Sequence, residues 1–197
     1  MKEVYLWFII WFSVWGLFNI KVRWILEKFH SRKYTGRGLF FLFAFIITSF
    51  YFDTHVTKYL PQLLVGTLLA NILGIFFAFF KNYYKKFAKD RFFLLFQTFN
   101  ILFQQTMVVI AISILKIIFG QEYKDYYFGI WFFMAHLPVL FVPWAKLRYQ
   151  YVIYALIGGI VFSYLINNIS NGLIITFLTH FCIYIWVISY LKDEEKI

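Results

Sequence analysis

Acidic residues are scarce in this chain. Nine Asp and Glu stand against 19 Lys and Arg, so the formal net charge is +10, and charged residues make up only 14% of 197. A soluble domain of this length needs many more polar side chains to cover its surface. Cys182 is the only cysteine, which excludes a disulfide scaffold. The composition also excludes a disordered or fibrous chain.

Apolar residues are abundant instead: 62% of the chain is hydrophobic, including 28 Phe. About 20 apolar residues are needed to cross the ~30 Å hydrocarbon layer of a bilayer. Seven runs approach that length: Val4–Ile20, Gly38–Phe52, Leu60–Phe80, Phe92–Phe119, Tyr127–Pro143, Val152–Asn167 and Leu173–Leu191. The sequence therefore predicts an all-α polytopic membrane protein, with residues 1–197 forming a single transmembrane domain of about seven helices.

The cations are divided unequally between the connections of these runs. One side would hold fifteen: Lys21, Arg23, Lys28, Arg32, Lys33, Arg37, Lys81, Lys85, Lys86, Lys89, Arg91, Lys146, Arg148, Lys192 and Lys196. The other side would hold Lys2, Lys58 and Lys124, with Lys116 near the end of the fourth run. Lys and Arg concentrate in short cytoplasmic loops, so we expect the N-terminus outside and the C-terminus in the cytoplasm. We therefore expect the basic loops to contact the lipid bilayer, and we expect no nucleic-acid partner. The chain is predicted to be a multi-pass protein of the bacterial cytoplasmic membrane.

Small residues predict where helices pack closely. Two runs carry them at four-residue spacing: Gly66, Ala70, Gly74 and Ala78 in the third, and Ala155, Gly159 and Ser163 in the sixth. Pro138 removes one backbone hydrogen bond in the fifth run, so we expect a kink just past His136.

Polar residues inside the apolar runs are the first place to look for function, because they are costly in lipid. Gln97, Asn100 and Gln104 share one helical face of the fourth run, with Gln105 beside them. His136 lies in the fifth run, and Thr176, His180 and Tyr184 share one face of the seventh. All three sets fall near mid-membrane, where we expect them to line one cavity.

Three segments of the chain resemble the sequence motifs of the CAAX-protease and bacteriocin-processing (CPBP) family of intramembrane glutamic endopeptidases, and they follow one another along the chain in the family's order. Phe132–His136 has the FxxxH pattern, and Asn171–His180 is similar to the approach to the family's HxxxN motif. Gln104-Gln105 stand where the glutamates of EExxxR would be. The resemblance implies a core over residues 90–191, preceded by N-terminal helices and basic cytoplasmic loops over 1–89. It also implies catalytic positions at Gln104, Gln105, His136, His180 and Tyr184.

The chain departs from the family at the residues that carry the chemistry. In the family a glutamate and a histidine activate water, while the second histidine and an asparagine stabilise the oxyanion. Here both glutamates are glutamines, Val109 replaces the arginine, and Tyr184 replaces the asparagine. A glutamine cannot act as a general base, and all nine acidic residues lie outside the seven runs. We therefore expect a non-catalytic member, a pseudoenzyme that binds a membrane-embedded peptide or a partner protein.

Neither a metal nor another cofactor is expected. A zinc site needs a third ligand, and Cys182 lies two residues from His180, on a different helical face.

Two other classes stay open from the sequence. The chain is an active intramembrane CAAX-type endopeptidase if Glu122 folds into the cavity, or if the two glutamines replace natural glutamates. Alternatively, it is a subunit of a membrane transport complex or another membrane assembly, with its amide-lined interior facing a neutral polar solute.

Overall fold

The computed structural model describes residues 2–22, 25, 33–78, 93–141 and 148–194. Within these ranges the chain is helical and contains no strand. Seven helices have twelve residues or more: α1 (Lys2–Leu17), α3 (Lys33–Tyr51), α5 (Leu60–Ala78), α7 (Phe93–Phe119), α8 (Asp125–His136), α9 (Arg148–Asn168) and α10 (Gly172–Glu194). Each of them covers most of one apolar run, so the prediction of an all-helical chain is confirmed.

Short helical segments connect or extend these helices. A π-helical turn, η1 (Phe18–Val22), continues α1, and α4 (Asp53–Val56) with the 3₁₀ turn η2 (Thr57–Tyr59) joins α3 to α5. The 3₁₀ turn η3 (Gly120–Glu122) follows α7.

The fifth run is not one continuous α-helix, which corrects the single kinked helix expected over Tyr127–Pro143. The α-helix ends at His136 and continues as the 3₁₀ segment η4 (Leu137–Phe141). Pro138 has no N–H to continue the α-helical pattern, and the N–H of Leu137 donates to the carbonyl of Met134. The proline thus ends α8 directly after its histidine. Residues 142 and 143 lie outside the described part of the chain.

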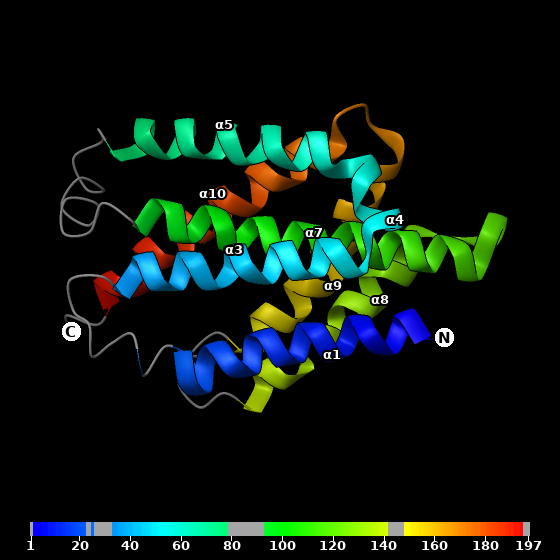
Figure 1. The fold of residues 1–197 in the computed structure, drawn as a ribbon, viewed down its shortest axis with the longest axis horizontal. Coiled ribbons are helices and arrows are strands. Elements are labelled where there is room, and N and C mark those ends of the chain that lie inside the picture. Colours follow the sequence, from blue (N-terminus) through cyan, green and yellow to red (C-terminus); the bar gives the residue numbers. More distant parts are fainter. Residues whose placement is uncertain (1, 23–24, 26–32, 79–92, 142–147, 195–197) are drawn as a thin grey trace.

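Helix α7 is the centre of the bundle, and the other helices surround it (Figure 1). Every side chain from residue 100 to residue 112 is buried. A helix that is apolar on all sides is stable only inside a protein or in lipid. Helix α7 has no charged residue from Phe93 to Leu115, which suits this central position.

Four helical segments are long and apolar enough to cross a membrane: Tyr34–Tyr51, Asp53–Phe77, Phe93–Glu122 and Tyr149–Asn168. Gly172–Ile185 is a shorter apolar helix. The outward faces of α3 and α5 are strongly apolar, with Phe50 80%, Phe43 63% and Leu68 61% exposed. Contiguous apolar surface of this extent suits contact with lipid rather than water.

The two ends of the bundle carry different elements. The start of α1 and the end of α10 lie at opposite ends (Figure 1). The start of α1, α4 and the end of α7 lie at one end, while η1 and the start of α3 lie at the other. Lys21 and Arg37, two of the fifteen cations expected on the basic side, belong to these last two elements. Most of the fifteen, including all five between Lys81 and Arg91, fall outside the described residues.

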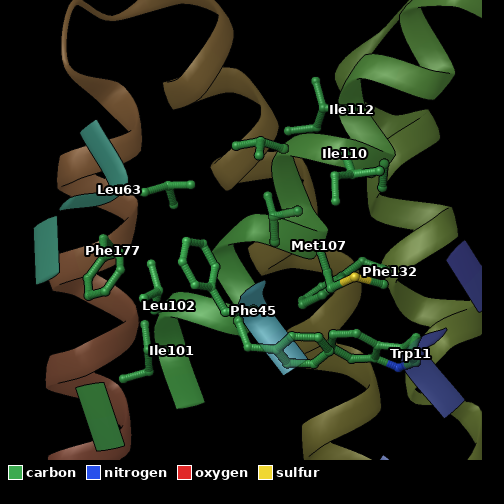
Figure 2. Close-up of a cluster of buried hydrophobic side chains, with 14 of the residues drawn as sticks. Trp11, Phe45, Leu63, Ile101, Leu102, Met107, Ile110, Ile112, Phe132 and Phe177 are labelled. Atoms are coloured by element: carbon green, nitrogen blue, oxygen red, sulfur yellow. The ribbon is translucent and has the colours of Figure 1, made fainter. Parts of the chain in front are cut away.

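The expected small-residue faces are places of close helix packing. A methyl group on Gly66 of α5 would lie 2.9 Å from the Phe177 ring of α10. One on Gly159 of α9 would lie 3.0 Å from the Cα of Gly129 on α8. Figure 2 shows the apolar core between these helices, in which Leu63 and Phe177 face Ile101 and Leu102, and Trp11 and Phe132 lie beside Met107.

Candidate functional site

Gln104 joins α7 to α10 through Tyr184. Its side-chain nitrogen Nε2 lies 2.9 Å from the Tyr184 hydroxyl and 2.9 Å from Oδ1 of Asn100, one turn earlier on α7. The hydroxyl also lies 3.3 Å from Oε1 of Gln104. Asn100 and Gln104 are both buried. Of the three polar residues expected on one face of α7, Gln104 contacts Tyr184 and Asn100 bonds to Gln104.

Gln105 makes a second junction with α10, through Thr176 and His180. Its Nε2 lies 3.1 Å from Nδ1 of His180 and 3.5 Å from the carbonyl oxygen of Thr176. The Thr176 hydroxyl lies 3.3 Å from Oε1 of Gln105. Gln105 and Thr176 are fully buried, so both ends of this amide are satisfied inside the bundle.

The Thr176 hydroxyl also lies 2.9 Å from the carbonyl oxygen of Leu173, to which it donates. The Gln105 amide therefore bonds Nδ1 of His180 in either of its two orientations, as donor or as acceptor. In both orientations the amide fixes the position of the His180 ring.

His136 is bonded within its own helix. Its Nδ1 lies 2.7 Å from the carbonyl oxygen of Phe132, one turn earlier on α8. Because a carbonyl only accepts, Nδ1 carries a proton and donates this bond.

Trp11 of α1 packs against both His136 and the part of α7 that precedes Gln104 and Gln105. Its ring centroid lies 5.7 Å from that of His136 and 6.3 Å from that of Phe103, the residue before Gln104. Gln104, Gln105, His180 and Tyr184 thus meet between α7 and α10, while the described contacts of His136 are with Phe132 and Trp11.

Gln97 is separate from these hydrogen bonds. It is 2% exposed, and no described residue hydrogen-bonds its Oε1. Gln97 shares the face of α7 that carries Asn100 and Gln104, but it lies two turns before Gln104.

Among the residues with a described side chain, no carboxylate contacts His136 or His180; the one histidine near a carboxylate is His55 of α4, 3.4 Å from Glu3. Glu122 is exposed in η3, seventeen residues after Gln105, which at 1.5 Å per residue is about 25 Å away. No group of three His, Cys, Asp or Glu that could hold a metal occurs in the described ranges. The site as described has hydrogen-bonding groups but no general-base carboxylate.

A second polar cluster lies at the junction of α8 and α9. The Ser163 hydroxyl donates to Oδ1 of Asp125 over 2.6 Å, and Asn167 donates to the same oxygen over 2.9 Å. Because the proton of Ser163 faces the carboxylate, the Tyr123 hydroxyl is the donor in its 2.5 Å bond to Ser163. Burial raises the pKa of the Tyr123 phenol above its ordinary value. This cluster joins helices and has no contact with the histidine site.

The sequence did not single out Trp11 as part of the site. Trp7, Trp11 and Trp15 recur at four-residue spacing on α1, which was the available signal. The spacing predicts one face of a helix, but not the helix that it contacts.

Neither the protein-family models, nor the curated proteins, nor the solved structures contain a match to this chain.

Proposed function

We propose that the chain is a multi-pass protein of the bacterial cytoplasmic membrane that binds a membrane-embedded peptide or partner protein without hydrolysing it. Its seven helices run with the N-terminus outside and the C-terminus in the cytoplasm. It has the architecture of the CPBP peptidases without their glutamate chemistry. One observation carries this proposal: Gln104 and Gln105 are hydrogen-bonded to Tyr184 and His180, at the positions where that family has its catalytic groups.

The geometry supports binding better than hydrolysis. Peptide hydrolysis needs a base that takes a proton from water, and the described hydrogen-bond partners of His180 and His136 are an amide side chain and a backbone carbonyl. Both ends of the Gln105 side chain are already engaged within the bundle. The site therefore offers fixed hydrogen-bonding groups in a low-dielectric interior, where polar contacts are strong and selective.

A peptidase assay tests the non-catalytic part of the proposal. The native protein in lipid nanodiscs is incubated with fluorogenic prenylated peptides, beside a His136→Ala variant. We expect the two proteins to show the same background signal. Cleavage by the native protein that disappears in His136→Ala would overturn this part. His55→Ala is the matched control, because His55 is also buried but belongs to α4.

Cysteine labelling tests the topology. After Cys182→Ser, single cysteines replace Lys2, Lys124 or Lys21 in intact cells, which are then treated with a thiol reagent that does not cross membranes. Lys2→Cys and Lys124→Cys should react at once, and Lys21→Cys only after permeabilisation. The reverse pattern would invert the orientation.

A further inference from the structure

The polar cluster at the junction of α8 and α9 leaves one carboxylate oxygen open to the outside. Oδ1 of Asp125 accepts hydrogen bonds from Ser163 and from Asn167. The second oxygen, Oδ2, makes no hydrogen bond within the described structure, and it is not one of the buried polar atoms without a partner. The start of α8 therefore presents an accessible acceptor that carries a negative charge.

Lys116 of α7 brings a positive charge to the same cluster. Its Nζ lies 5.8 Å from the centroid of the Tyr123 ring, and the hydroxyl of that ring is hydrogen-bonded to Ser163. Described contacts thus connect the lysine to Asp125 through one tyrosine and one serine. Neither charge forms an ion pair with another residue in the described part of the chain. The cluster therefore offers both an unpaired cation and an unpaired carboxylate.

In the multi-pass arrangement proposed above, this end of α7 lies at the level of lipid headgroups. The helix has 27 residues, or about 40 Å, which matches the thickness of a bilayer with its polar layers. Lys116 lies about 5 Å before the end of the helix, near the boundary between hydrocarbon and headgroups. The next residues, Ile117 and Ile118, are 69% and 49% exposed, as suits contact with acyl chains. A lysine ammonium at that depth reaches for the polar layer, where the anions are lipid phosphates.

A headgroup with both charges fits these two groups best. Every phospholipid has a phosphodiester anion that a lysine can bind. A headgroup with only negative charge would be repelled by Asp125, whereas a primary ammonium group would donate an N–H to the free Oδ2. We propose that Lys116 and Asp125 bind one phosphatidylethanolamine molecule, with the lysine on its phosphate and the carboxylate on its ammonium group. This inference rests on the membrane location in the proposed function, but not on peptide binding.

Three lipids with the same acyl chains and phosphate test the proposal on the native protein. Nanodiscs contain equal amounts of dioleoyl phosphatidylethanolamine, its N,N-dimethyl derivative and dioleoyl phosphatidylcholine, of which only the last has no N–H on its ammonium group. Native mass spectrometry identifies the last lipid that the released protein keeps. We expect each of the first two to be kept about tenfold more often than phosphatidylcholine, the usual effect of one hydrogen bond to a charged group.

Two substitutions separate the roles of the two charges. Asp125→Asn keeps an oxygen for its two described donors but removes the charge, so the preference over phosphatidylcholine should fall several-fold. Lys116→Gln should weaken retention of all three lipids and leave their ratio unchanged, because all three contain the phosphate. Asp53→Asn and Lys2→Gln are the matched controls, since they make the same charge changes at the same end of the bundle (Figure 1). Both should retain lipids as the native protein does.

The outcomes separate this inference from the function beneath it. If the native protein keeps the three lipids equally, recognition of the amine is wrong while the membrane location stands. A preference that persists unchanged in a folded Asp125→Asn protein also overturns the inference. If that variant does not fold, the lipid series on the native protein decides alone. If the native protein is found in the aqueous fraction of cells and does not enter nanodiscs, the membrane location and the inference fail together.

Discussion

The indole N–H of Trp11 donates to the carbonyl oxygen of Ala135 over 3.2 Å, and Ala135 directly precedes His136. The last four carbonyls of an α-helix lack an intrahelical donor, and Pro138 removes one of the N–H groups that would follow. Trp11 thus satisfies a carbonyl at the end of α8 and also packs on the histidine ring. The first helix of the chain helps to hold the site histidine in place.

Trp11→Phe should therefore destabilise the protein by about 1 kcal/mol, the usual net value of one hydrogen bond. Thermal unfolding in detergent micelles measures the loss. Trp15→Phe is the matched control, because the buried Nε1 of Trp15 has no partner among the described residues. An equal loss in both variants would show that ring size, rather than the hydrogen bond, is what Trp11 contributes.

Much of this fold follows from local sequence. The apolar runs predict the helices because a helix satisfies its own backbone wherever water is absent. Helical periodicity placed Gln104 and Gln105 on α7 and His180 and Tyr184 on α10, and the described structure brings these pairs together. Pro138 predicted a kink just past His136, and the α-helix instead ends at that residue.

The remaining features depend on contacts between distant segments. The bond from Trp11 to Ala135 joins residues 124 positions apart, and no local pattern encodes the partner of an indole. The hydrogen-bond partner of the His180 ring is an amide on another helix, which only the packed bundle brings to it. For the same reason, the isolation of Gln97 from the other polar residues of its face was not predictable.

Gln105 and Gln97 should respond differently to loss of their amides. Gln105→Leu leaves Nδ1 of His180 without its described hydrogen-bond partner, and we expect a loss of about 1–3 kcal/mol. Gln97→Leu removes an oxygen that has no partner, so the folded state should lose little or gain. Both side chains are buried on the same helix, so thermal unfolding of the two variants is a direct comparison. Similar losses would contradict the assigned hydrogen bonds.

The packing of α8 against α9 should depend on Gly129. A methyl group there would lie 2.5 Å from Ile160 and 2.9 Å from the carbonyl oxygen of Leu156, and that backbone atom cannot rotate away. Gly129→Ala should therefore cost about 1–3 kcal/mol by overpacking. Gly158→Ala is the control, because nothing lies within 4 Å of its added methyl group. It should be neutral or slightly stabilising, as alanine favours the helix. If Gly129→Ala unfolds at the same temperature as the native protein, α8 and α9 move apart at little cost in free energy and the prediction is wrong.

Alkaline titration should reveal the cluster of Tyr123, Ser163 and Asp125. Burial raises the pKa of Tyr123 in the folded protein, so the folded state holds a proton that the unfolded chain releases near pH 10. Stability from this group is fully present below that pH and is lost as the pH rises toward the higher folded pKa. Tyr123→Phe should therefore lose less stability than the native protein between about pH 9 and 11, although it is less stable at neutral pH without the bond to Ser163.

Tyr5→Phe, at an exposed position on α1, should follow the native curve. If Tyr123→Phe follows the native curve as well, the phenol is not held in its neutral form by the fold.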